Sequence, residues 1–168
     1  MQPIKWTDRK FTFGYEKGYV PFFIERLNAT APRLEELLNG ITDERASEKT
    51  GEAWSVKEHI GHLSDLERLH DGRIDDFIAG AAELRPADMS NKETYAAGHN
   101  EQSIPRLLSH FREEQNKFLK RVASLEDQYF ERKALHPRLQ QIITPTDLLF
   151  FIAEHDTHHL ARIAQLLK

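Results

Sequence analysis

The sequence predicts an all-α protein, a four-helix bundle with a long crossover loop. Apolar residues recur at spacings of three and four in four separate stretches, residues typical of helix starts precede three of them, and no stretch alternates like a β-strand. Amphipathic helices of this kind bury their apolar faces against one another. With 168 residues, of which 39% are hydrophobic and 30% charged, the chain is expected to form a single domain over residues 1–168.

The composition excludes several classes of protein. The chain has no cysteine, which rules out disulfides, thiolate metal ligands and a cysteine nucleophile, and which agrees with a cytoplasmic location. The net charge of -4 is spread along the chain, so a binding surface for nucleic acid or for an anionic membrane is not expected. No apolar run is long enough to span a membrane, and the polar residues 1–10 do not resemble a secretory signal.

The first part of the chain is expected to contain an irregular N-terminal arm and one helix. Residues 1–14 show no clear periodicity and are interpreted as the arm. Three of its aromatic residues are expected to cover the core: Trp6, Phe11 and Phe13. The first helix is predicted over residues 20–38, with a kink or break near Thr30 because Pro32 lies within it. A polar loop over residues 40–53 follows.

The second helix has the clearest start signal. Ser55 followed by Glu58 forms a capping-box pattern, and the apolar periodicity then continues to about Ala79. His62 lies on an arc beside the main apolar stripe, and leucines continue that arc, so this histidine is expected to point inward. Residues 80–102 contain few large apolar groups and are predicted to form the long crossover loop, with room for one helical turn.

Two further helices complete the predicted bundle. Ser103 is the expected N-cap of the third helix, and Pro105 lies near its first position. A connection over residues 125–143, which includes a His-Pro pair, is expected to be irregular because it shows no strand alternation. Thr144 caps the last helix and Pro145 opens it.

The histidines are the unusual part of the composition. There are nine in all, and His155 and His159 are four positions apart on the apolar face of the last helix. This spacing lets one helix present two imidazoles to a single metal ion. His62 is the candidate third ligand from another helix, and His59 is the fallback. The competing interpretation is a solvated, histidine-rich helix end, but it would leave two unpaired imidazoles on a buried stripe, where a shared metal would satisfy both.

Three imidazoles around one ion would leave a position open for water or substrate, as in catalytic rather than structural metal sites. The neighbouring residues are assigned more ordinary roles. His158 is about 100° around the helix from His159 and is expected to face away from the site. Glu154 and Asp156 are expected to lie on the solvated surface, with orientation of a ligand or base chemistry as the alternative. Glu58 is explained by its capping role, although it lies one turn before His62.

Two segments resemble a known family. Residues 54–63, with the sequence W-S-V-K-E-H-I-G-H-L, resemble the W-S-hydrophobic-K-E-x-x-G-H-L segment of the DinB/YfiT-like superfamily of metal-dependent proteins. Residues 153–159, A-E-H-D-T-H-H, resemble its A-E-H-D-x-H-H segment on the last helix. The resemblance implies a four-helix bundle, often a homodimer, with one divalent metal ion (Zn, Ni, Fe or Mn) bound by His62, His155 and His159. One departure is Arg162, where the family often has glutamine.

These observations lead to one main hypothesis and two alternatives. The main hypothesis is a metal-dependent enzyme acting on a small molecule, either a thiol S-transferase that uses a low-molecular-weight thiol or a hydrolase, with substrate entering between the helix ends beside residues 80–102. No residue is assigned as catalytic, and the sequence does not choose between the two reactions. The alternatives are a non-catalytic metal- or ligand-binding bundle involved in stress response, and a structural helical dimer with incidental histidines.

Overall fold

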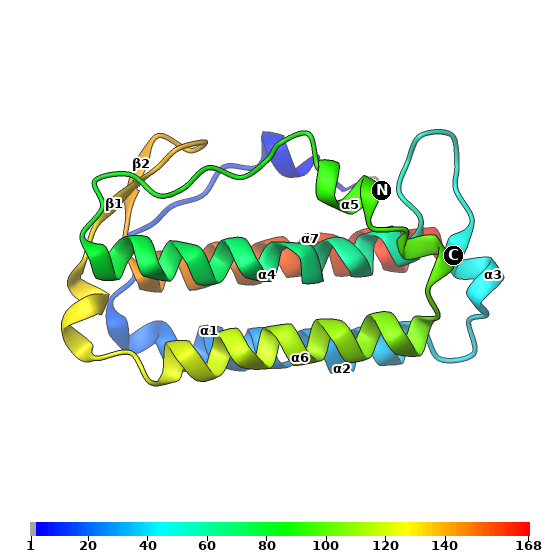
Figure 1. Cartoon of the computed structure of the whole chain (residues 1–168), viewed down its shortest axis with the longest axis horizontal. Coiled ribbons are helices and arrows are strands. Elements are labelled where there is room, and N and C mark those ends of the chain that lie inside the picture. The colour runs from blue at the N-terminus through cyan, green and yellow to red at the C-terminus, as the bar shows by residue number, and fades with distance from the viewer. Residues whose placement is uncertain (1–2) are drawn as a thin grey trace.

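The computed structural model describes residues 3–168, and its helices form the four rods of a bundle (Figure 1). The rods are α1 (Val20–Asn28) with α2 (Thr30–Leu37), α4 (Val56–Ala79), α6 (Ile104–Ala123) and α7 (Pro145–Leu166). Helix α4 packs against α6 and α7, and the α1–α2 rod packs against α7 and α6, so that each rod has two neighbours. The all-α prediction is confirmed, and the long helices begin and end close to the residues expected from the sequence.

The first rod is broken where the sequence predicted a kink. Helix α1 ends at Asn28, Ala29 separates the two segments, and α2 begins at Thr30. Pro32 is the cause, because a proline ring clashes with the carbonyl group four residues earlier and cannot donate a backbone hydrogen bond. The break places Thr30 inside the bundle, where its side chain is buried.

Capping interactions fix the starts of the two helices that carry the histidines. Ser55 and Glu58 form the predicted capping box of α4, which ends at Gly80 in a left-handed conformation with φ of 70°. Thr144 and Asp147 form a second capping box at the start of α7. An Asp147 oxygen also accepts hydrogen bonds from the backbone N–H groups of Gly14 and Tyr15, where the N-terminal arm ends. The start of α7 therefore holds the arm in place.

A layer of polar side chains divides the bundle core in two. Each rod contributes one buried member: Thr30, Glu67, Gln115 and Asp156. The apolar core residues form one cluster at the end that includes Ile143 and a second cluster at the opposite end that includes Ile60. Asp156 links the layer, since its Oδ2 accepts hydrogen bonds from Thr30 Oγ1 at 2.8 Å and from Gln115 Nε2 at 3.3 Å.

Three segments cover the same face of the α4–α7 pair (Figure 1). The first is the chain before α1, which consists of the N-terminal arm with the short helix η1 (Trp6–Asp8) and then the short helix η2 (Lys17–Tyr19). The second is the crossover loop with α5 (Lys92–Ala96) and η3 (His99–Glu101), and the third is the chain before α7. In the arm, the rings of Trp6 and Phe11 lie 5.0 and 5.2 Å from the ring of Phe151. Residues 1–2 of the expected arm lie outside the described residues.

The structure corrects two expectations about the connections. The stretch 125–143 is not wholly irregular, because after η4 (Asp127–Glu131) it forms an antiparallel hairpin of β1 (Ala134–His136) and β2 (Gln141–Ile143). Strands of three residues are too short to show alternation, and the crossover loop stabilises β1 through backbone hydrogen bonds in both directions. The expected polar loop before α4 contains the short helix α3 (Asp43–Ser47). Within residues 3–168, none of the helices has the length and apolar content needed to cross a bilayer.

Candidate metal centre

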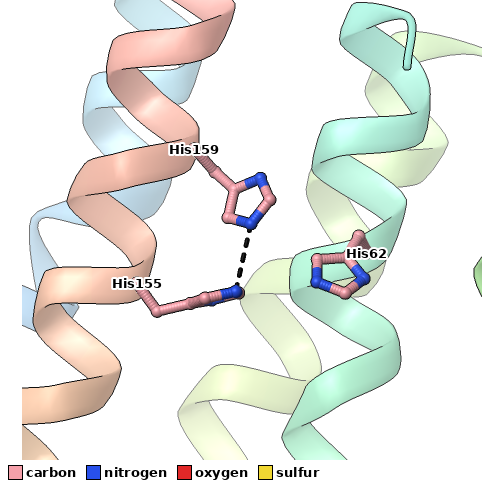
Figure 2. Close-up of side chains that lie close together, drawn as sticks. All are labelled: His62, His155 and His159. Atoms are coloured by element: carbon pink, nitrogen blue, oxygen red, sulfur yellow. Dashed lines mark hydrogen bonds between the residues drawn. The ribbon is translucent and has the colours of Figure 1, made fainter. Parts of the chain in front are cut away.

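Imidazoles from two helices converge at one point in the structure. His155 and His159 extend from successive turns of α7, and His62 faces them from α4 (Figure 2). One ring nitrogen from each residue lies within 4.8 Å of the others, and all three side chains are buried. Among residues 3–168, this is the one group of three or more potential ligands close enough together to hold a metal ion.

The two α7 histidines are already close to ligand spacing. Their Nε2 atoms are 3.1 Å apart, which the dashed line in Figure 2 marks. Two imidazoles on one tetrahedral zinc ion have nitrogens about 3.3 Å apart, from a Zn–N distance of about 2.0–2.1 Å. The ring of His62 lies 5.4 Å from that of His155 and 5.0 Å from that of His159. The spacing therefore fits a small divalent ion after modest rotation of the side chains.

Burial keeps the cluster uncharged. It lowers the pKa of His62 to about 4, and it holds the pKa values of His155 and His159 well below the usual value, with the neighbouring histidines adding to the effect. A neutral imidazole has a free lone pair, which is the form that binds metal. In addition, Nδ1 of His155 is buried and has no hydrogen-bond partner among the described residues. The donor set therefore suits a metal ion.

The crossover loop sets which nitrogen of His62 faces the cluster. Thr94 Oγ1 donates a hydrogen bond to Asp65 Oδ2 at 2.8 Å, so its one hydroxyl hydrogen is used and it must accept the hydrogen bond from His62 Nδ1 at 3.0 Å. His62 therefore carries its proton on Nδ1, and its Nε2 lone pair is free. His99 Nε2 lies 3.0 Å from the same Asp65 oxygen and completes the chain of contacts.

Gly61 makes this arrangement possible. A Cβ atom at position 61 would lie 2.2 Å from the His99 ring, so only glycine lets η3 approach α4 this closely. Sequence reasoning had no basis for selecting Thr94, Asp65 and His99. These residue types are common in solvated loops and helices, and their roles depend on contacts across the fold.

His59 lies behind His159 rather than in the cluster. Its Nδ1 is 2.8 Å from Nδ1 of His159, whereas Nε2 of His159 faces His155. Burial, followed by the charge of Arg162, lowers the pKa of His59 to about 3. The structure thus places the fallback ligand where it orients His159, which is the usual role of a residue that supports a metal ligand.

The structure changes the roles expected for the flanking residues. His158 is outside the cluster, but it does not face away, since its half-buried ring lies 5.7 Å from that of Trp6 and lines the cavity described below. Asp156 was expected at the surface and is instead 3% exposed in the polar layer of the core. Burial, followed by the charge of Glu67, raises the pKa of Asp156 to about 8.

The two glutamates also have structural partners. Glu154 is partly buried and pairs with Arg9 of the arm and with Arg26 of α1, so it anchors the arm rather than lying free in solvent. Glu58 caps α4, as expected, and pairs with Lys49 at 2.8 Å. Neither residue belongs to the histidine cluster. Both positions reflect contacts between distant segments, which helical periodicity does not predict.

The cluster opens into a cavity of about 590 Å³. The cavity lies beside residues 86–91 of the crossover loop, as expected, but over the α4–α7 face rather than between the helix ends. Trp54 packs over the cluster with its ring 4.6 Å from that of His62, and Trp6 lies 4.9 Å from the ring of His155. Apolar walls next to a few polar groups are typical of small-molecule sites.

Comparisons with known proteins agree with this architecture. The family model described as the DinB superfamily matches residues 26–163. A solved structure, YfiT from Bacillus subtilis, is similar over 94% of this chain and 91% of its own, with a TM-score of 0.75 and 22% sequence identity. It is described as a probable metal-dependent hydrolase with an unusual four-helix bundle topology. At this identity the similarity establishes the fold alone. Curated protein sequences gave no match.

Proposed function

Since the chain belongs to the DinB superfamily, we propose that it is a metal-dependent enzyme in which His62, His155 and His159 bind one divalent metal ion. The observation that carries the proposal is the convergence of three buried, neutral imidazoles beside a cavity of about 590 Å³. A bound ion of this kind would act as a Lewis acid and would lower the pKa of water or of a thiol. Zinc, nickel, iron and manganese are the candidate metals.

The surrounding residues supply the other parts of such a site. Thr94 and His59 orient two of the ligands by hydrogen bonding to their remaining ring nitrogens. Trp6 and Trp54 pack against the cluster and limit the access of water. His158 is half-buried at the cavity, with its ring 5.4 Å from that of His159, and is placed to accept a proton. We assign the reaction to one of two types, hydrolysis or transfer of a small thiol.

Metal analysis of untagged protein tests the proposal directly. Elemental analysis is expected to find about one divalent ion per chain in the wild type, and His62→Ala or His155→Ala should reduce this at least tenfold, because two imidazoles bind far more weakly than three. His110→Ala is the matched control, since His110 is exposed on α6. Equal metal content in all four proteins would contradict the proposal.

Two measurements distinguish the reaction types. In the cobalt-substituted protein, a low-molecular-weight thiol should shift the visible spectrum if a thiolate binds the ion, as thiol transfer requires. An unchanged spectrum, together with turnover of esters or amides, would favour hydrolysis.

A non-catalytic bundle that binds metal or another ligand, with a role in stress response, is the second candidate function. One observation favours it. Among the described residues lining the cavity, Asp88 is the only one with a carboxylate, and its oxygens accept hydrogen bonds from Ser90 and Lys92. Metal-loaded protein that turns over neither thiol–electrophile pairs nor esters and amides would support this candidate.

We further propose that the protein is a homodimer. Tyr19 and Phe22 are 49% and 65% exposed, and their rings lie 6.2 Å apart at the start of the first rod. Neighbouring exposed aromatic residues are common where two subunits meet. Sedimentation velocity should give the mass of two chains, and Phe22→Ser should shift the equilibrium towards the monomer. A monomeric wild type at high micromolar concentration would contradict the proposal.

A further inference from the structure

Two arginines line the cavity without an acidic partner. Arg73 lies on α4, and Arg138 lies in the turn between β1 and β2. Within residues 3–168, neither guanidinium has a carboxylate within ion-pair distance. Arg73 is only 3% exposed and donates from Nε to the backbone oxygen of Arg85 at 3.2 Å. The carboxylate of Asp76, which acts on Arg73 electrostatically, is already paired with Arg85 at 2.7 Å.

The contacts of Arg138 leave part of its guanidinium unsatisfied. Its Cζ lies 5.6 Å from the ring centroids of both Trp6 and Phe151, so aromatic faces rather than acceptors surround it. Its Nη2 is buried and has no hydrogen-bond partner in the described part of the chain. Burial lowers the pKa of Arg73 to about 10 and also lowers that of Arg138, and both remain charged at neutral pH.

A second unsatisfied donor lines the same cavity. His136 is 2% exposed, and its Nδ1 accepts a hydrogen bond from the backbone N–H of Leu139 at 3.3 Å. The proton of the neutral ring is therefore on Nε2, which is buried and has no acceptor within the described residues. Burial lowers the pKa of His136 to about 3, followed by the charges of Arg73 and Arg138. The ring of His136 lies 5.1 Å from that of Phe151, and Arg138 Cζ lies 5.6 Å from the same ring. Both side chains therefore lie at one wall of the cavity that Arg73 also lines.

The rest of the cavity adds only one opposing charge among the described residues. Its one carboxylate among the described residues, Asp88, is occupied by hydrogen bonds from the loop backbone. Buried donors without acceptors are unfavourable unless a ligand satisfies them, and guanidinium groups match carboxylate and phosphate oxygens in shape and charge. Arg138 Cζ lies 5.6 Å from the ring of Trp6, and the ring of His155 lies 4.9 Å from it, so this positive charge is near the histidine cluster.

We propose that Arg73, Arg138 and His136 form an anion subsite, which binds the carboxylate or phosphate group of a small substrate whose apolar body extends towards His155. The aromatic rings of Trp6 and Phe151 pack against each other and line the same cavity, where the apolar body of the substrate would lie. The inference rests on the proposed function, because it assigns the anion to the substrate of that site. Arg162, the departure noted in the sequence, does not line the cavity and bonds to Gln165 instead.

Binding of matched acid and amide probes to metal-free protein tests the subsite. The probes are benzoate, phenylacetate and 3-phenylpropionate, their neutral amides, and phenyl phosphate. Calorimetry and tryptophan emission measure their binding. At least one acid should bind roughly 10- to 100-fold more tightly than its own amide, or phenyl phosphate should bind more tightly than all three amides by a similar factor, because the charged hydrogen bonds are lost in an amide. The acids and the phosphate distinguish the two sources of the anion.

Variants then assign the binding to the named residues. Arg138→Gln should remove the preference for anions, and Arg138→Lys should restore part of it. Arg73→Lys should independently weaken the binding of anions, and its long side chain avoids leaving an empty space beside α4. Arg162→Gln is the matched control and should bind like the wild type. Circular dichroism and thermal unfolding confirm that each variant is folded.

The outcomes separate this inference from the proposed function. Equal binding of every acid and amide, no binding of any probe, or loss of binding in Arg162→Gln but not in Arg138→Gln would overturn the subsite. Because the probes are tested without metal, anion binding by a protein that never takes up metal would leave the subsite standing and the metal-dependent function rejected. Metal uptake without a preference for anions would reject the subsite alone.

Discussion

At the scale of single residues, the hydroxyl of Thr94 determines which nitrogen of His62 carries the proton. It accepts a hydrogen bond from His62 Nδ1 and donates one to Asp65 Oδ2, so one side chain from the crossover loop selects the tautomer of a candidate ligand on α4. Polar groups that hold a ligating histidine in this way tune metal affinity without touching the metal.

Replacing this threonine tests the tautomer argument. Thr94→Val keeps the shape of the side chain but removes the acceptor, and we expect metal affinity to fall roughly 10- to 100-fold. Competition with a chelator of known affinity measures the change. Thr50→Val, at an exposed loop position, is the control and should leave the affinity unchanged. Equal affinity in Thr94→Val and wild type would show that the tautomer of His62 does not depend on this hydroxyl.

The buried carboxyl of Glu67 predicts a pH dependence of stability. Burial, followed by the charges of Glu114 and Asp71, raises its pKa from 4.5 to about 8. The folded chain therefore keeps a proton that the unfolded chain releases above about pH 4.5. The stabilisation from this bound proton is fully present below about pH 4.5 and is lost as the pH rises towards about 8.

The variant Glu67→Gln has no such proton to lose. Its free energy of unfolding, relative to that of the wild type, should increase with pH between about 5 and 8, by up to about 1.4 kcal/mol per pH unit. Urea unfolding at several pH values measures the difference, with Glu36→Gln on the exposed face of α2 as the control. A constant difference across this interval would mean that Glu67 is ionised in the folded protein.

At the scale of elements, the close approach of η3 to α4 depends on a single glycine. Position 61 lies within a helix, where alanine is normally favoured by about 1 kcal/mol. A Cβ there would nevertheless meet the ring of His99 at 2.2 Å, and that ring is buried and bonded to Asp65. Steric overlap therefore opposes helix propensity at this position.

We expect the cost of the steric overlap to exceed the gain in helix propensity. Gly61→Ala should lower the free energy of unfolding by about 1–3 kcal/mol, as overpacking of a close contact typically does. It should also weaken metal binding, since displacement of His99 disturbs the contacts behind His62. Gly18→Ala is the matched control, because a Cβ at position 18 would meet nothing within 4 Å. A Gly61→Ala variant as stable as the wild type would contradict the assigned role of the contact.

At the scale of the whole molecule, the candidate site joins segments from most of the chain. Helices α4 and α7 provide the imidazoles, the crossover loop orients one of them, and the arm and the hairpin close the cavity. A ligand that binds only this assembled state stabilises the complete fold by mass action.

Metal should therefore raise the melting temperature. With free metal at 100 times its dissociation constant, the gain is about 2.7 kcal/mol, which corresponds to a rise of several degrees for a chain of this size. Calorimetry with and without a chelator measures the shift. His155→Ala should show no shift, whereas His110→Ala should behave like the wild type. An identical melting temperature for loaded and metal-free wild-type protein would contradict a site that links the two helices.

The features that could be predicted from the sequence alone depend on local interactions. Capping boxes, proline positions and helical periodicity act over a few residues, and they specified the long helices, the break before α2 and the placement of His155 above His159. The inward-facing arc of the second helix gave His62 as the candidate third ligand, and the two short motifs identified the family and agreed with that choice. None of these signals depends on which distant segments come together.

Only the tertiary structure decided which distant groups meet. It placed Thr94 behind His62, buried Asp156 in a polar layer, paired the two short strands and brought Arg138 to the cavity that contains His155. Their local sequence is compatible with a solvated surface, and their roles follow from packing between segments far apart in the chain. Periodicity reports which face of a helix is buried, whereas the partner on that face is set by how the whole chain packs.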